Sequence, residues 1–176
     1  MVTIRAEILS DVAPREALLD RAFGRGRNRK TSQRFRDGRL PAEGLAFTAL
    51  SKSGRVIGTL RMWNVIAGSA GPSLLLGPLA VDARYKGRGF GIEMMNHALN
   101  MAKVLGHHSV VLVGDESYYG RFGFTRGLVA DLHLPGPVDR NRFLGLDLVS
   151  NALNGAEGLV MASGDLAQNA LDVRAA

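Results

Sequence analysis

A run of closely spaced glycines between an apolar segment and a helical pattern most constrains how this chain can fold. The apolar segment ends at Val81, glycines stand at positions 87, 89 and 91, and a helix-forming pattern continues to about Leu105. Glycine lets backbone N–H groups approach a ligand without a Cβ in the way. The first turn of a helix adds unpaired N–H groups and a partial positive charge, and Lys86 and Arg88 add full charges. The run therefore predicts a strand–turn–helix unit that binds an anion, with a pyrophosphate as its natural ligand.

Two familiar nucleotide-binding patterns do not account for these glycines. The P-loop ends in Gly-Lys-Ser/Thr, and the dinucleotide fingerprint has two residues between its last glycines. This chain has no Gly-Lys-Ser/Thr there, and a single residue separates Gly89 from Gly91. A glycine-rich turn without a ligand stays the alternative to an anion site.

Hydrophobic periodicity and turn residues divide the chain into alternating elements. We expect helices from about Asp11 to Phe23, over residues 31–37 and from the glycine turn to about Leu105, with a short helix near Ser117. The expected strands comprise residues 2–9, 45–50, 56–65, 73–81, 109–113, 128–132, 143–148 and 159–162. This order indicates an α+β, or mixed α/β, fold in a single domain over residues 1–176.

Composition narrows the chemistry and the compartment. The chain has no cysteine, which excludes a disulfide framework, a cysteine zinc site and a thiol nucleophile. Arg5 and Glu7 interrupt the first apolar residues, so the start of the chain does not resemble a signal peptide. We therefore expect a soluble, cytoplasmic protein.

Positive charge is concentrated in one segment. Between Arg21 and Arg39 there are eight basic residues and one acid, so this segment carries +7 while the whole chain carries +6. Three interpretations stay open: a nucleic-acid patch, a wall that attracts an acidic ligand or substrate, and a solvated basic loop without a specific partner. No recognition motif surrounds the segment, which places nucleic-acid binding last.

A second cluster of reactive residues follows the next buried strand. The sequence Gly114-Asp-Glu-Ser-Tyr-Tyr-Gly-Arg-Phe-Gly-Phe124 comes directly after residues 109–113. If strands 73–81 and 109–113 are parallel, their carboxyl ends, and hence both clusters, meet at one edge of the sheet. Tyr118 and Tyr119 then offer a phenol to a bound ligand. In the alternative, one ring packs and the other hydroxyl bonds to the turn.

Together the two clusters resemble the GNAT superfamily of acyl-CoA-dependent N-acetyltransferases. The pyrophosphate motif of that family is Gln or Arg, two residues, Gly, one residue, then Gly or Ala. Here it is Lys86-Gly-Arg-Gly89-Phe-Gly91, with lysine in place of the usual first residue. Tyr119-Gly-Arg-Phe-Gly123-Phe124 matches the family's tyrosine followed by a Gly-Phe pair. The longer run from Gly114 is similar to the YhbS-like branch in particular, and the resemblance is most specific between residues 75 and 125.

The resemblance implies a fold and a reaction. The fold is a central mixed, mostly antiparallel sheet with one splayed parallel pair, flanked by helices. The reaction is direct transfer of the acetyl group of acetyl-CoA to a primary amine of a small molecule or peptide. Acetyl-CoA is then the cosubstrate, no metal takes part, and a homodimer is an expectation from the family alone. The basic segment falls where the family builds its acceptor site, so an acceptor with a carboxylate or phosphate is expected, with Arg27 and Arg29 as candidate contacts.

The resemblance also assigns roles to individual residues. Backbone N–H groups from Gly87 to Ile92 hold the pyrophosphate, and Leu79 and Val81 bond to the pantetheine arm. Because Pro78 has no N–H, we expect Leu79 to donate to the thioester carbonyl. Tyr119 lies near the sulfur and protonates the departing thiolate. The cofactor-binding set is Leu79, Ala80, Val81, Lys86, Gly87, Arg88, Gly89, Phe90, Gly91 and Ile92.

No residue is an evident general base. The strand expected at 73–81 contains no carboxylate and no histidine. Asp115 and Glu116 are candidates by position, but capping of the short helix explains either one. His107 and His108 stand at a helix end, where the helix dipole accounts for them. A chain of waters would then take the proton from the amine, or the amine would arrive already neutral. A catalytically weak CoA-binding sensor stays the alternative to an enzyme.

Overall fold

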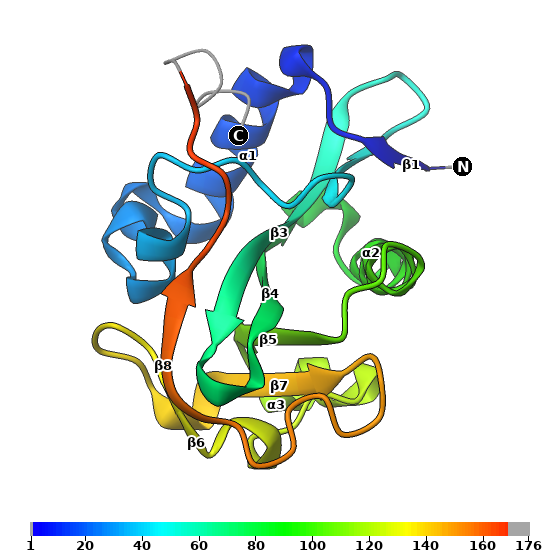
Figure 1. The fold of residues 1–176 in the computed structure, drawn as a ribbon. Helices are drawn as coiled ribbons and strands as arrows, with labels where there is room; N and C mark the ends of the chain where they lie inside the picture. The colour runs from blue at the N-terminus through cyan, green and yellow to red at the C-terminus, as the bar shows by residue number, and fades with distance from the viewer. Residues whose placement is uncertain (1, 169–176) are drawn as a thin grey trace.

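The computed structural model describes residues 2–168, and it contains a central sheet with helices on both faces (Figure 1). The strands are β1 (Thr3–Ala6), β2 (Ala46–Leu50), β3 (Val56–Ala67), β4 (Pro72–Val81), β5 (Ser109–Val113), β6 (Asp131–His133), β7 (Phe143–Asp147) and β8 (Glu157–Ala162). The α-helices are α1 (Val12–Phe23), α2 (Phe90–Val104) and α3 (Glu116–Tyr119). Among the short 3-10 turns, η2 (Arg25–Arg29), η3 (Thr31–Phe35), η5 (Ala83–Tyr85) and η7 (Gly127–Val129) bear on the site or the core.

The sheet confirms the expected mixed, mostly antiparallel topology. Its strands follow the order β1-β2-β3-β4-β5-β7, and β4 with β5 is the parallel pair along that path. Off the path, β8 pairs antiparallel with the end of β3 and parallel with β6. The helix α2 forms the crossover that connects the two parallel strands, as a parallel pair requires.

The pairing between β4 and β5 is short, and this opens the sheet. Leu74 pairs with Val110 and Leu75 with Val111, and the register between the two strands extends no further. From Leu76 to Val81, β4 pairs on its other edge with β3 alone among the described strands. The two strands thus form a splayed pair, with a free backbone edge of β4 inside the opening.

A bulge lies in β4 at the mouth of this opening. Leu60 pairs with Leu79 and Met62 with Leu76, so the single residue Arg61 faces both Gly77 and Pro78. The Trp63 indole Nε1 donates a 2.7 Å hydrogen bond to the Gly77 carbonyl oxygen inside the core. A bulge of this kind re-aims the strand that carries it, and here it lies just before Leu79.

The two long helices cover opposite faces of the sheet (Figure 1). On one face, Met94, Met95 and Ala98 of α2 are buried against the cluster that contains Ile57. On the other face, Leu18 and Leu19 of α1 pack against Val56 and Ala80. Adjacent strand residues point to opposite faces, which is why Val56 and Ile57 belong to different clusters.

Three segments differ from the sequence-based expectation. The strand expected at residues 2–9 is limited to Thr3–Ala6, and Leu9 begins a 3-10 turn that precedes α1. Residues 31–37 do not form an α-helix: the basic segment folds as η2 and η3, and Phe35 is its buried hydrophobic residue. Without an apolar stripe, that segment has no face to pack as a longer helix. Residues 128–132 are also not one strand, because η7 covers 127–129 and β6 begins at Asp131. Val129 enters the core from η7 instead.

Candidate active site

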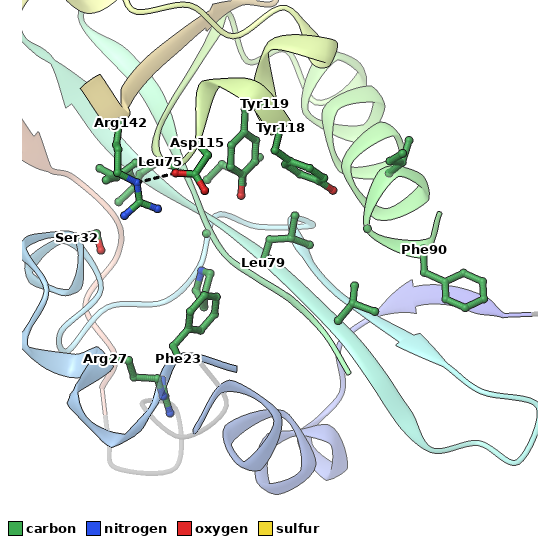
Figure 2. Close-up of a pocket in the computed structure, with 18 of the residues that line it drawn as sticks. Phe23, Arg27, Ser32, Leu75, Leu79, Phe90, Asp115, Tyr118, Tyr119 and Arg142 are labelled. Carbon is green, nitrogen blue, oxygen red and sulfur yellow. Dashed lines mark ion pairs between the residues drawn. The ribbon is translucent and has the colours of Figure 1, made fainter. Parts of the chain in front are cut away.

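A cavity of about 770 Å³ occupies the opening between β4 and the segment that follows β5. The size is that of a small-molecule site. One wall is β4 with the first turn of α2, and the other is α3 with the end of β5; the basic turns face both of them (Figure 2). Its lining includes Phe23, Arg27, Lys30, Ser32, Gln33, Arg36, Gly77, Pro78, Leu79, Val81, Lys86, Gly87, Gly89, Phe90, Gly91, Ile92, Gly114, Asp115, Tyr118, Tyr119, Arg121 and Arg142.

The glycine turn presents a row of backbone donors to the cavity. Gly87 and Gly89 have φ values of +77° and +83°, a region that L side chains rarely adopt. The first hydrogen bond of α2 runs from the Glu93 N–H to the Gly89 carbonyl. Within the described part of the chain, no hydrogen bond uses the N–H groups from Gly87 to Ile92. These free N–H groups at a helix N-terminus form a cradle for an anion.

Asp82 anchors the start of this turn. Its carboxylate accepts a 3.0 Å hydrogen bond from the Arg84 N–H and pairs with the Arg84 guanidinium at 2.7 Å. Arg21 of α1 lies 3.8 Å from the same carboxylate. The Arg84 hydrogen bonds, followed by the nearby positive charges, hold the pKa of Asp82 well below its usual 3.8. Asp82 is therefore an anion that ties η5, and the turn behind it, to the end of β4.

Tyr119 is held with its ring against the end of β5. A Cβ at Gly114 would lie 2.3 Å from Cε2 of the Tyr119 ring, so only glycine admits the ring there. The ring also contacts Tyr118 edge-on, with centroids 4.9 Å apart, and Phe124 at 6.0 Å. Burial, with a smaller effect of Tyr118, raises the pKa of Tyr119 to about 12. The phenol therefore carries its proton throughout the physiological pH range and can act as a donor.

Tyr118 lies beside the first turn of α2. A Cβ at Gly91 would approach the Tyr118 hydroxyl oxygen to 2.9 Å. The Arg121 guanidinium lies over the Tyr118 ring at 4.9 Å, and its Nε donates to the Tyr118 carbonyl. Both tyrosines thus extend from α3 toward the cavity, as Figure 2 shows, with Tyr118 on the side of the glycine cradle.

Tertiary contacts occupy much of the basic segment. Arg27 pairs with Glu16 and with Asp20, both of them on α1. Arg34 donates to the Pro135 carbonyl and Arg39 to the Gly164 carbonyl. Much of the positive charge therefore links segments of the fold, which argues against a continuous nucleic-acid surface.

Asp115 is the sole carboxylate on the cavity wall within the described residues, and it is paired. Its Oδ1 lies 3.1 Å from Nε of Arg142, the last residue of the 3-10 turn η8 (Arg140–Arg142) that precedes β7 (Figure 2). Glu116 pairs with Arg126 and does not line the cavity. His107 and His108 lie before the first residue of β5, at the opposite end of that strand from Tyr119, and no histidine lines the cavity in the described chain.

Comparison with known proteins assigns the family. The model of the acetyltransferase (GNAT) family matches residues 14–124. The uncharacterized N-acetyltransferase YhbS of Escherichia coli K12 is 34% identical over 159 residues, which cover 89% of this chain and 93% of that protein. The chain belongs to the GNAT family of acetyltransferases.

Solved structures of GNAT proteins share the architecture. The crystal structure of E. coli YhbS in complex with CoA superposes with a TM-score of 0.78, at 32% identity over 92% of this chain and 89% of that one. A GNAT acetyltransferase from Brucella melitensis in complex with acetyl-CoA gives a TM-score of 0.63, at 25% identity over 97% of both chains. Both relatives therefore share the overall fold of this chain.

The cavity collects most of the residues expected from the GNAT motifs. Leu79, Val81, Lys86, Gly87, Gly89, Phe90, Gly91, Ile92 and Tyr119 all line it. Ala80 and Arg88 do not: Ala80 packs against α1, and Arg88 lies over the Tyr85 ring at 5.5 Å. The binding roles of the whole set stay predictions.

Two cavity residues were not singled out by the sequence. Arg142 stands at the end of a short 3-10 turn without a motif, and only the fold brings it to Asp115. Arg36 was one of eight basic residues in its segment, and nothing local separates it from the others. Arg29, a candidate contact by sequence, is exposed and is not part of the cavity lining.

Residues 2–168 contain neither a metal-binding cluster nor a membrane-spanning helix. In residues 2–168, no group of three or more His, Asp or Glu side chains is arranged to hold a metal ion. None of the helices in this range is long and apolar enough to cross a membrane.

Proposed function

We propose that this protein transfers the acetyl group of acetyl-CoA directly to a primary amine of a small molecule or peptide. The observation that carries the proposal is the splayed β4–β5 opening, which has free glycine amides at one end and the Tyr119 phenol on its wall. Acetyl-CoA supplies an activated thioester when bound. The CoA complexes of the two relatives above support this choice of cosubstrate.

The chain's own groups have separate tasks in this proposal. N–H groups from Gly87 to Ile92 hold the pyrophosphate, with Lys86 adding charge beside them. The free edge of β4 pairs with the pantetheine amides, and the Leu79 N–H, just past the bulge and Pro78, polarises the thioester carbonyl. Tyr119 donates a hydrogen bond from its phenol to the departing sulfur and so stabilises the negative charge that develops there.

The amine reaches the site neutral, because the described lining of the cavity contains no histidine and its one carboxylate, Asp115, is paired with Arg142. Asp115 is engaged by Arg142, and the pKa of about 12 keeps Tyr119 protonated. The rate should therefore rise with pH until the amine of the acceptor is deprotonated. The same ion pair favours a second candidate function, a CoA-binding sensor with little catalysis, because it leaves the cavity without an unpaired carboxylate among the described residues.

Calorimetric titration of acetyl-CoA and of CoA tests the cradle. Gly89→Glu places a carboxylate beside the pyrophosphate and should weaken both affinities at least tenfold. Gly89→Ala adds the same backbone strain without the charge, and Gly127→Glu adds the charge at an exposed glycine with no close neighbours. Equal acetyl-CoA affinities in Gly89→Glu and Gly89→Ala would show that the pyrophosphate does not bind at this turn.

A thiol-release assay over an amine library then separates enzyme from sensor. Release of CoA that depends on an amine supports acetyl transfer. Micromolar binding of acetyl-CoA without release by any amine would favour the sensor instead.

A further inference from the structure

Arg36 is a partly buried cation without an ion-pair partner among the described residues. It caps the end of η3, next to Phe35, whose side chain is 1% exposed in the core and anchors the turn. Its Nε atom is buried and has no hydrogen-bond partner, and its guanidinium makes no ion pair with a described carboxylate. Asp37, the adjacent acid, accepts from the Gln33 side chain at 2.8 Å instead. Burial, with a smaller effect of Arg27, lowers the pKa of Arg36 to about 10, so the group stays charged near neutral pH.

The neighbouring cations on the cavity wall have partners within the chain. Arg27 is paired with two carboxylates of α1, and Arg142 with Asp115. Lys30 lies over the Phe23 ring at 5.1 Å. A charge that is partly removed from water and has no counter-ion, as Arg36 has here, carries a desolvation cost that a bound anion would offset. Among the basic-segment cations that line the cavity, Arg36 is thus the one with neither a carboxylate nor an aromatic ring as a partner in the described residues.

Arg36 lies close to the position where the reaction would occur. A Cβ built on Gly77 would be 3.3 Å from its Nη2, so the guanidinium rests against the β4 bulge. Leu79 follows Gly77 by two residues, which separates them by at most about 7 Å. A small acceptor could therefore bind Arg36 with an anionic group and place its amine at the thioester, because only a few covalent bonds need to separate the two groups.

We propose that Arg36 binds a carboxylate on the acceptor, so that the substrate is a small amino acid whose amine and carboxylate are a few bonds apart. This inference rests on the proposed function, because it takes the amine position from the thioester. A planar guanidinium matches a carboxylate with two parallel hydrogen bonds. One unpaired positive charge also matches the single charge of a carboxylate, whereas a phosphate dianion would leave one negative charge uncompensated. In this proposal Arg36 selects acceptors with a negative charge at one end, and the amine at the other end of the acceptor lies at the thioester.

The test compares amines that differ only in this charge. Thiol release is measured with the standard amino acids and β-alanine against their amides, and with 2-aminoethyl phosphate. For accepted pairs, we expect kcat/KM to be about 10- to 100-fold higher for the acid, the range of hydrogen bonds to a charged group. Equal values for acid and amide, or a preference for the phosphate, would overturn the proposal.

Variants assign the preference to Arg36. Arg36→Gln keeps a polar side chain and removes the charge, so it should raise KM for the acid and leave kcat/KM for the amide within about twofold. Arg29→Gln removes the same charge from an exposed position outside the cavity and should change neither. An acid preference that persists in Arg36→Gln would contradict the assignment. Acetyl-CoA affinity, measured by calorimetry, reports whether the variant keeps its fold.

A binding measurement separates this inference from the proposed reaction. The measurement is nitrogen-15 NMR of the arginine Nε–H groups in the CoA-bound protein, and the Arg36→Gln variant assigns the Arg36 signal. Glycine or β-alanine is added first, and the corresponding amides are added in a separate titration. A shift of the Arg36 signal with the acids alone supports the subsite even if no amine releases thiol. Thiol release without such a shift, and without acid preference, overturns the subsite and keeps the transferase. Neither release nor shift overturns both.

Discussion

Replacing Tyr119 with phenylalanine removes one oxygen and leaves the ring. The ring packs edge-on against Tyr118 and Phe124, and neither contact uses the hydroxyl. No hydrogen bond between the hydroxyl and another described residue is lost, and a phenyl ring still fits beside Gly114. The fold and the acetyl-CoA affinity should therefore be kept, so that a change in kcat reports on the hydroxyl.

The size of the effect follows from two pKa values. The pKa of Tyr119 is about 12, and that of a free thiol is about 8.5. Full proton transfer to the departing thiolate would thus be uphill by about 5 kcal/mol at 1.36 kcal/mol per unit. The phenol instead stabilises the developing charge as a hydrogen-bond donor, worth about 1.5–3 kcal/mol. We expect kcat to fall roughly 10- to 100-fold, at the low end of acid catalysis.

The assay is steady-state release of CoA with a thiol reagent, with acetyl-CoA affinity measured on the same samples. Tyr118→Phe is the matched control, because it removes the same oxygen from the neighbouring ring and should leave kcat within about twofold. The reduction in Tyr119→Phe should also be constant between pH 6 and 9, since the phenol does not titrate there. An unchanged kcat with intact affinity would remove Tyr119 from the reaction, and equal losses in both variants would attribute the effect to packing.

Three further outcomes are expected from the same geometry. Gly114→Ala displaces the Tyr119 ring, so it should lower kcat about as much as Tyr119→Phe while keeping acetyl-CoA affinity; normal kcat would contradict the ring placement. A Cβ at position 91 would lie 2.9 Å from the Tyr118 hydroxyl oxygen, so Gly91→Ala should weaken acetyl-CoA binding several-fold. Combining it with Tyr118→Phe should restore the affinity, and calorimetry that shows no recovery would refute the contact. The depressed pKa of Asp82 adds stability above its unfolded value of 3.8, and this stability is lost as pH falls below that value. The difference in thermal midpoint between wild type and Asp82→Asn should therefore be present at pH 7 and shrink below about pH 4; a constant difference would argue against the ion pair.

Local sequence predicted the strands and the turn that build the cosubstrate side of the cavity. The apolar run expected at residues 73–81 is β4, and residues 109–113 form β5 as expected. The glycines at 87 and 89 adopt positive φ values, and the helix begins directly after them. Each of these features depends on residues that are neighbours in the chain, so their patterns are visible without a fold.

Local sequence was less informative for the basic segment and for the core. An α-helix was expected over residues 31–37, and the single 3-10 turn η3 (Thr31–Phe35) formed there instead, with Phe35 as its buried hydrophobic anchor. The strand expected at 128–132 was also wrong, since Val129 packs into the core from a 3-10 turn. In both segments, packing against distant elements outweighed the local propensity.

The amino-acid sequence alone determined the GNAT motifs, the cradle glycines and the excess of positive charge between Arg21 and Arg39. It did not determine which of those charges stays unpaired. Glu16 and Asp20 on α1 neutralise Arg27, and Arg142 pairs with Asp115 from a distant 3-10 turn. Arg36 lies partly buried beside Gly77 without an ion pair to a described carboxylate. Backbone conformation follows from adjacent residues, whereas the partner of a charge depends on distances between segments that only the packed fold brings together.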